Sequence, residues 1–324
     1  MYKICTIGGG SGMPVVNQAL IKSGIGRISS IVTTFDSGGD TGRLRTDERG
    51  NLLAFSDYWR ALISLWKDGD KKRIWEDMLR FRDSRGRNFG NSFFVALREK
   101  VGDVNRVGKV FAQMVGADMG GEVIPVCLSP SDICFETESG AVYKGEHRLD
   151  ELRMSRDMVK RIWLEPKVSV NSKVLEALND ADLIVVCPGS MYGSILVNFL
   201  TDGFCQVFTK SKAKKILMTN IMSTRNENDG FDQEMYLKTF EYYLDDQNVF
   251  DIIVMADLSK LDKVKLKQVL RNYDLEYSNP IKFNEKSKVK AEVVDIAIIE
   301  EKNMRLRHGV DKLAKWFRMG NEMG

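Results

Sequence analysis

The stretch 4–13, with the sequence ICTIGGGSGM, constrains this chain more than any other part of it. A short apolar run meets three glycines, a serine and a fourth glycine, and a helical pattern of apolar residues follows from Val15. This order predicts a strand, a tight turn and a helix. Glycines let the backbone turn sharply and approach a ligand closely, and the N–H groups at a helix start favour a phosphate. The alternative is a turn that needs only small residues.

The turn matches no known phosphate-binding pattern completely. Gly8 and Gly10 fit the start of a dinucleotide fingerprint, but Met13 stands where the third glycine would be. The Gly-Lys-Ser/Thr ending of a Walker A loop does not follow either. The candidate phosphate contacts of this turn are Gly8, Gly9, Gly10, Ser11, Gly12 and Met13.

Composition limits the class of protein. The 324 residues, 43% of them hydrophobic, can bury the core of one large α/β domain spanning 1–324. The 48 basic and 45 acidic residues give a net charge of +3, so we expect no duplex nucleic acid as partner. No apolar run is long enough to span a bilayer, and the chain starts directly with a strand, so we expect no signal peptide.

The cysteines and histidines give little evidence of a metal or redox site. The five cysteines form no CxxC pair, which predicts buried reduced thiols in a cytoplasmic protein. A histidine-rich metal site or a serine triad would need one of only two histidines, His147 and His308. We therefore give neither residue a role at this point.

A second glycine loop follows the next expected strand, 28–33. Asp36 lies where an acid often meets a ribose hydroxyl in dinucleotide-binding folds. The loop ends with Arg43 and Arg45, and arginines bind phosphate in a bidentate way. The alternative is a flexible surface loop with solvated charges.

The remaining pattern predicts a Rossmann-like, doubly wound, mostly parallel α/β sheet. Helices are expected over about 51–82, from 88–91 onward and over about 105–115. Asn91 could cap the second of these or reach a ligand, and capping is favoured. Segments 123–128, 133–136, 141–144 and 159–164 suggest a small β-rich insertion around 122–165. Further strands are expected at 182–187, 216–219 and 252–255.

Three polar loops follow strands of this expected sheet. Besides the first two glycine loops, Pro188, Gly189 and Ser190 follow the apolar strand 182–187. Ligands of such sheets lie outside the carboxyl ends of the strands. The three loops would meet at that edge, which favours one shared site.

Six motifs, in order along the chain, resemble the CofD/YvcK family. The first two are IGGGSG at 7–12 and DSGGDTGRLR at 36–45, which resemble the family's GGGTG and DDGGSSGRLR loops. Next come FGN at 89–91 and PGSMYGSI at 188–195, followed by Asn198. The last are NIMS at 220–223, with Glu227, Asp229 and Gly230, and the pair Arg307-His308 before KLA at 312–314.

The resemblance implies a Rossmann-like fold, a cytoplasmic protein and usually a homodimer. CofD-type members are 2-phospho-L-lactate transferases, which move a phospholactyl group from a guanosine diphosphate donor to the deazaflavin Fo with magnesium. YvcK-type members are gluconeogenesis factors that bind nucleotide-type ligands such as UDP-sugars and affect carbon metabolism and cell shape. The GRLR and NIMS segments favour the YvcK branch. Matching to the family's motifs adds these candidate ligand contacts: Gly38, Gly39, Asn91, Tyr192, Ser194, Asn198, Asn220 and Met222.

The chain departs from the family pattern at a carboxylate pair. Ser37 replaces the family's second aspartate, and Asp40 stands at its first loop serine. If the pair holds a metal or activates a hydroxyl, the lost carboxylate weakens an enzymatic role unless Asp40 replaces it. We therefore take Asp36 and Asp40 as candidate catalytic residues and Asp36 as the candidate metal ligand.

The leading hypothesis is a nucleotide- or nucleotide-sugar-binding protein of the YvcK type. Its ligand would be a UDP-sugar, GDP or a dinucleotide, held through backbone N–H groups and hydroxyls, with Mg²⁺ as a candidate cofactor. The rival is a CofD-type transferase that works by positioning and electrostatics. A nicotinamide-dependent oxidoreductase is less favoured because it depends on the glycine loop alone.

Overall fold

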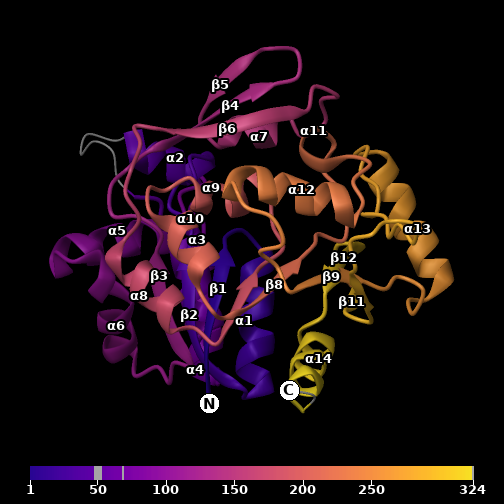
Figure 1. Ribbon diagram of the computed structural model, residues 1–324. Coiled ribbons are helices and arrows are strands. Elements are labelled where there is room, and N and C mark those ends of the chain that lie inside the picture. The colour runs from indigo at the N-terminus through magenta and orange to yellow at the C-terminus, as the bar shows by residue number, and fades with distance from the viewer. Residues whose placement is uncertain (47–52, 68, 323–324) are drawn as a thin grey trace.

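A seven-stranded parallel sheet with the order β10-β9-β8-β7-β1-β2-β3 forms the centre of the molecule (Figure 1). The computed structural model describes residues 1–46, 53–67 and 69–322. The strands are β1 Tyr2–Gly8, β2 Gly26–Val32, β3 Gly121–Pro125, β7 Leu183–Val186, β8 Lys214–Met218, β9 Ile252–Ala256 and β10 Glu292–Val294. The prediction of a Rossmann-like, mostly parallel α/β fold is confirmed.

Helices cover both faces of this sheet. On one face lie α1 Gly12–Ser23, α3 Ser56–Ser64, α5 Phe89–Val101, α6 Val104–Val115 and α14 Val310–Glu322. On the other face lie α8 Ser172–Asp180, the π-helix η1 Met191–Leu196, α9 Val197–Phe199, α10 Phe204–Lys210 and α12 Gln233–Leu244.

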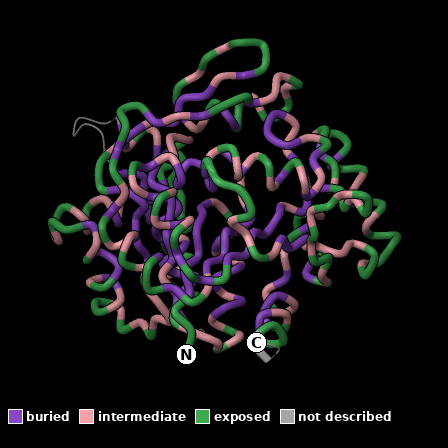
Figure 2. Tube along the Cα trace, in the orientation of Figure 1, coloured by how far each residue is buried: buried purple, intermediate pink, exposed green. Residues whose placement is uncertain are grey.

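Neighbouring residues of one strand pack into the two hydrophobic cores on opposite faces of the sheet. Ile4 packs into the core that contains α1, whereas Cys5 packs into the core that contains α8. Apolar side chains on both faces explain why the inner strands read as continuous apolar runs. Figure 2 shows the resulting buried centre with exposed residues around the rim.

The strand order reverses between β1 and β7, which are neighbours in the sheet although β1 starts at Tyr2 and β7 starts at Leu183. Chain connections leave this point in opposite directions, so a crevice opens between the turns that follow the two strands. Both glycine-containing turns predicted as ligand sites, 8–12 and 188–190, lie at this point of the sheet.

A three-stranded antiparallel sheet forms the upper part of Figure 1. It consists of β4 Asp132–Thr137, β5 Val142–Lys144 and β6 Val159–Glu165, with α7 His147–Glu151 between the last two. The predicted hairpin of β4 and β5 is confirmed. The strand expected at 123–128, however, is β3 at the edge of the large sheet, because it pairs with β2. The small sheet therefore begins at β4, and not at residue 122.

Three local predictions differ from the structure. The second glycine loop becomes helical as α2 Gly39–Thr46. The helix expected over 51–82 is divided into α3 and α4 Asp70–Arg80, while 51–52 lie outside the described residues. Trp66 forms a β-bridge with Met119 between the two helices, a long-range contact that replaces helix. Asn88, and not Asn91, caps α5: its side chain accepts the Asn91 N–H.

The C-terminal part adds a second small sheet beside the cleft described below. It consists of the antiparallel strands β11 Ala297–Glu300 and β12 Arg305–His308. Two more helices belong to this half of the chain, α11 Arg225–Asn228 and α13 Lys263–Asp274, and α14 packs against α1. The five cysteines are free thiols, and four of them are buried, as predicted. In the described part of the chain, no helix combines the length and apolar character needed to cross a membrane.

Candidate functional site

A cleft of about 410 Å³ opens at the carboxyl ends of β1, β7 and β8. Two of its walls are the turns at the strand-order reversal, through Ser11 and Gly12 on one side and 188–190 on the other. The segment after β8, from Asn220 to Arg225, forms its floor. Its far wall comes from α7, the end of α13 and β12, which are distant in the sequence.

The N-terminus of α1 faces this cleft without a capping side chain. Ser11 is the exposed N-cap residue, and its side chain makes no capping hydrogen bond. The first N–H groups of a helix have no partner inside the helix and carry partial positive charge. A phosphate in the cleft would supply the missing acceptor.

Close packing explains the glycines of this turn. A Cβ on Gly12 would overlap the Pro188 carbonyl oxygen, and one on Gly9 would lie 2.6 Å from Asp57 Oδ2. Gly10 has a φ of +63°, in the left-handed region that favours glycine. The glycines at 9 and 12 thus let protein segments approach one another. Because Gly10 has a positive φ, a valine there would strain the backbone with or without a ligand.

The turn after β7, in contrast, uses its own hydrogen-bonding groups internally. The Gly189 N–H donates to Asn220 Oδ1 at 2.8 Å, and Asn220 Nδ2 donates to the Gly189 carbonyl at 2.7 Å. The Ser190 hydroxyl donates to Glu227 Oε1 at 2.6 Å and accepts the Gly193 N–H at 3.0 Å. The Gly189 N–H, a predicted contact of the diphosphate, is therefore already paired within the protein.

Several carboxylates lie beside the turns. The Gly10 N–H donates to Asp57, yet burial and the nearby Asp36 raise the Asp57 pKa to about 6. Burial raises the pKa of Glu146, and the charges of Asp36 and Asp150 raise it further. Glu227, 3% exposed, has its pKa raised to about 7 by burial. This side of the site therefore changes its charge near neutral pH.

Asp36 lies within this acidic group, in the loop after β2. Its Oδ1 accepts the Gly38 N–H at 2.8 Å, and its Oδ2 accepts the Ser56 hydroxyl. Among the described residues, no three His, Cys, Asp or Glu side chains are arranged to hold a metal ion. Magnesium is commonly held by one or two carboxylates together with phosphate oxygens and water, so the oxygen ligands present suit Mg²⁺ only with a bound phosphate.

Arginines form the far wall of the cleft. Arg153, after α7, donates to Glu276 Oε2 at 2.8 Å, and Arg305 of β12 pairs with the other oxygen of the same carboxylate. Arg225 stacks on the Tyr277 ring, with 3.8 Å between its Cζ atom and the ring centroid. Arg307 also lines the cleft. These guanidinium groups add positive charge to the same cleft that the N-terminus of α1 lines.

Both histidines lie near the site, contrary to the low weight that the sequence gave them. His308 lines the cleft, and burial lowers its pKa to about 4, so its imidazole is neutral at physiological pH. His308 Nε2 is buried and has no hydrogen-bond partner among the described residues. His147 Nδ1 lies 3.0 Å from the Ser37 hydroxyl.

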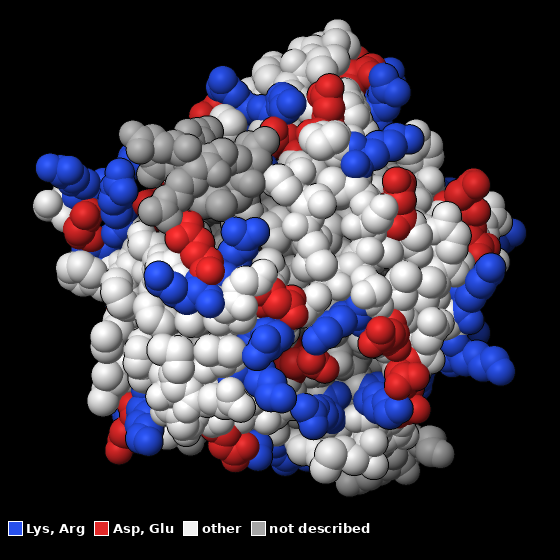
Figure 3. Space-filling view, turned by 90° about the vertical axis from the view of Figure 1, so that its left-hand side faces the viewer, with Lys and Arg blue, Asp and Glu red and all other residues white. Residues whose placement is uncertain are grey.

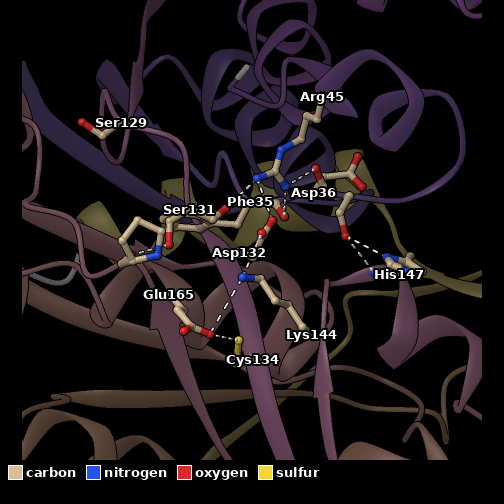
Figure 4. Close-up of polar contacts among 12 residues, drawn as sticks. Phe35, Asp36, Arg45, Ser129, Ser131, Asp132, Cys134, Lys144, His147 and Glu165 are labelled. Atoms are coloured by element: carbon tan, nitrogen blue, oxygen red, sulfur yellow. Dashed lines mark hydrogen bonds and ion pairs between the residues drawn. The ribbon is translucent and has the colours of Figure 1, made fainter. Parts of the chain in front are cut away.

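The two arginines predicted to neutralise phosphate have other contacts, and Figure 4 shows those of Arg45. Arg45 is 5% exposed and donates to the carbonyls of Phe35, Asp36 and Ser131 and to Asp132 Oδ1. It therefore connects the loop after β2 to the small sheet. Arg43 is exposed and donates to the Arg85 carbonyl at 3.1 Å. Neither residue lines the cleft.

Several other predicted contacts are buried inside the protein. Asn91 donates to Asp40 Oδ2 at 3.0 Å, and both residues are buried. Met13 lies in the hydrophobic core, and Asn198 donates to the carbonyls of Ser194 and Ile195. The Tyr192 hydroxyl donates to a backbone carbonyl of β6.

Of the predicted contacts, the cleft brings together Ser11, Gly12, Pro188, Gly189, Ser190, Asn220 and Met222. The loop residues Gly38 and Gly39 lie beside Asp36, outside the cleft lining.

The sequence interpretation missed most of the far wall and of the acidic group. Glu227 and Arg307-His308 lie in motifs that the sequence offered, so their positions were available as signals. Asp57, Glu146, Asp150, Arg153 and Arg305 carry no comparable pattern. They come from separate elements: Asp57 lies on α3, Asp150 on α7 and Arg305 on β12.

Comparison with known proteins identifies the family. The model of the family described as 2-phospho-L-lactate transferase CofD matches residues 4–303. This chain belongs to the CofD family. Within the family, it is 32% identical to the putative gluconeogenesis factor of Aquifex aeolicus over 245 residues, 73% of each chain. It is 28% identical to the gluconeogenesis factor of Bacillus subtilis over 324 residues, 96% of each chain.

A crystal structure from the same family has the same fold. The UPF0052 protein of Bacillus halodurans superposes with a TM-score of 0.83 at 26% identity and covers 97% of this chain and 98% of its own. The full-length relatives named gluconeogenesis factor support the YvcK-like branch for this chain.

Proposed function

We propose that this protein is a YvcK-like nucleotide- or nucleotide-sugar-binding protein whose ligand lies in the cleft between α1 and the arginine wall. The uncapped N-terminus of α1 carries the proposal, since it opens into a cleft at the reversal of strand order. The cleft volume of about 410 Å³ lies in the range typical of small-molecule sites.

In this proposal the diphosphate of a UDP-sugar, of GDP or of a dinucleotide lies at Ser11 and Gly12. The guanidinium groups across the cleft offset its charge, a role first assigned to Arg43 and Arg45. Asp36 would bind ribose or share Mg²⁺ with phosphate oxygens. A gluconeogenesis factor acting in carbon metabolism and cell shape, in the cytoplasm and as a homodimer, is the biological setting that we propose.

The transferase alternative has one specific observation in its favour. Asp57 has a pKa of about 6 and lies against Gly9 and Gly10, next to the expected phosphate position. A buried carboxylate that titrates near neutral pH can serve as a general base. The same cleft would then position a phospholactyl donor of the CofD type, with the reaction driven by positioning and electrostatics.

A charge at the start of α1 tests where the ligand binds. Ser11→Asp keeps a good N-cap residue but places a carboxylate where we expect the diphosphate. We expect a folded protein with an unchanged or higher melting temperature and at least tenfold weaker binding of UDP-glucose in calorimetry. Gln18→Glu is the matched control, because it adds the same charge to α1 about 10 Å along the helix axis. Equal losses in both variants would contradict the proposed site.

The ligand class and the metal are tested with the wild-type protein. A ligand at one hundred times its dissociation constant should stabilise the fold by about 2.7 kcal/mol. We expect this shift with a UDP-sugar, GDP or a dinucleotide, and a melting screen without any shift at millimolar concentration would contradict nucleotide binding.

If Asp36 shares Mg²⁺ with the ligand, EDTA weakens binding and Asp36→Asn removes the effect of EDTA. An affinity that EDTA leaves unchanged would exclude the metal.

A further inference from the structure

Glu227 connects the turn after β7 to the cleft. Its carboxylate accepts two donors of that turn, the Ser190 hydroxyl at 2.6 Å and the Met191 N–H at 2.8 Å. The residue is 3% exposed, and both it and Ser190 line the cleft. The donors that a phosphate would find at this wall are therefore bound to a carboxylate of the protein itself.

The ionised carboxylate opposes an anionic ligand in two ways. It places a negative charge at the wall that faces the start of α1, and it keeps the single hydrogen of the Ser190 hydroxyl. Protonation removes the charge and lets Ser190 turn its hydrogen toward a ligand oxygen. Hydrogen bonds to a charged partner are among the stronger ones in proteins.

Opposing effects act on the Glu227 pKa: burial and the charge of Asp150 raise it, and the hydrogen bonds from Ser190 and Met191 lower it. Asp150 of α7, Glu146 just before α7, and the hydroxyls of Tyr192 in η1 and Tyr236 in α12 lie within electrostatic range of Glu227. The arginines Arg153, Arg225, Arg305 and Arg307 line the same cleft and carry the opposite charge. Burial accounts for most of the rise of the Glu227 pKa to about 7. His308, in the cleft lining from β12, has a pKa near 4 and stays neutral above pH 6.

We propose that Glu227 is a positioning residue that couples ligand binding to proton uptake. The ionised form holds the β7 turn closed to phosphate, and the protonated form releases the Ser190 hydroxyl to the ligand. This inference rests on the proposed function, because it needs a nucleotide diphosphate in the cleft. Its chemistry is simple: one proton moves from solvent to the Glu227 carboxylate as the anion binds.

The test follows UDP-glucose binding by calorimetry from pH 6 to pH 8.5. Its diphosphate diester has no ionisation in this range, so a pH effect comes from the protein. We expect the affinity of the wild type to fall above pH 7, with a limit of tenfold per pH unit. Glu227→Gln imitates the protonated state, so its affinity should fall much less above pH 7 than that of the wild type and should exceed it at least fivefold at pH 8.5.

Asp150→Asn is the matched control. Asp150 also lines the cleft and also carries a negative charge, but within the described part of the chain its side chain makes no hydrogen bond to the β7 turn. This variant should keep the pH slope, because it removes charge without releasing the Ser190 hydroxyl. If the dependence of affinity on pH became equally weak in both variants, Glu227 would act only as one of several negative charges, and the positioning role would be wrong.

A measurement on the wild type covers the case in which Glu227→Gln does not fold. Calorimetry at pH 7.5 in buffers of different ionisation enthalpy gives the number of protons taken up on binding. Uptake between about 0.5 and 1 proton supports the inference, and no uptake overturns it. Binding without pH dependence overturns only the inference, whereas the absence of nucleotide binding at every pH overturns the proposed function.

Discussion

The Ser190 hydroxyl has a single hydrogen, which it donates to Glu227 while its oxygen caps η1. The sequence predicts that this hydroxyl contacts phosphate. A serine in a glycine-containing turn gives no sequence signal that its hydroxyl is hydrogen-bonded within the protein. In the structure, the hydroxyl stabilises the turn itself.

Ser190→Ala should therefore destabilise the free protein. The substitution leaves the Gly193 N–H without its acceptor and Glu227 without one donor, so we expect a loss of about 1–2 kcal/mol in the free energy of unfolding. Urea denaturation without ligand measures this. Ser84→Ala, at an exposed serine of the loop after α4, should change stability by less than about 0.5 kcal/mol. If Ser190→Ala is as stable as the wild type, the capping role is wrong.

Asp57 makes stability depend on pH. Its pKa rises from 3.8 in the reference state to about 6 in the fold, so the folded state holds more protons between these values. The contribution of Asp57 to the free energy of unfolding is therefore fully present below pH 4 and is lost as pH rises toward 6. Asp57→Asn should remove this loss. When pH rises from 4.5 to 8, the free energy of unfolding of the variant should increase relative to that of the wild type by about 2 kcal/mol.

Denaturation curves at the two pH values check this prediction. The comparison within each protein cancels the effects of all other groups that the two proteins share. A difference between variant and wild type that is the same at both pH values would show that Asp57 is ionised in the fold throughout this range.

At the scale of elements, local signals decided which predictions succeeded. The apolar runs of β1 and β7 and the glycine turns after them carry their own patterns, and both were predicted. β3 has a strand pattern too, but its pairing with β2 is a contact across about 90 residues that no local pattern contains. The break after α3 likewise comes from a bridge between Trp66 and Met119.

Arg43 and Arg45 show the same limit for the site. They lie two residues apart on α2 with the same chemistry, and burial alone separates their roles. The guanidinium group of Arg45 fits between the loop after β2 and β4 (Figure 4), where it satisfies three carbonyls and one carboxylate. A sequence pattern cannot distinguish this contact from a phosphate contact.

Arg45→Met should therefore destabilise the fold strongly. It leaves three carbonyls and the Asp132 carboxylate without their donor, for an expected loss of about 3 kcal/mol. Arg43→Met is the matched control and should cost less than about 1 kcal/mol, because Arg43 is exposed. Chemical denaturation of both variants measures the difference. Equal stabilities would mean that Arg45 does not connect the small sheet to the large one.

At the scale of the whole molecule, the cleft depends on segments that are far apart in the sequence. Its walls combine the start of α1 with α7, the segment after β8 and β12. The Asn226 side chain donates to the Leu149 carbonyl and so attaches α11 to α7, while Glu276 links Arg153 to Arg305. On the face seen in Figure 3, basic and acidic side chains lie side by side.

This assembly predicts a definite pattern of ligand protection in hydrogen exchange. UDP-glucose at one hundred times its dissociation constant should slow local exchange in 8–15, 147–153, 220–227 and 305–308 together, because all four segments line one cleft. The turn of the β4–β5 hairpin, 138–141, lies outside the lining and serves as the internal control. Protection limited to 8–15 would mean that the ligand contacts the glycine turn alone. The cleft would then not be its site, and the arginine wall would have to be explained as a structural contact between α7 and β12.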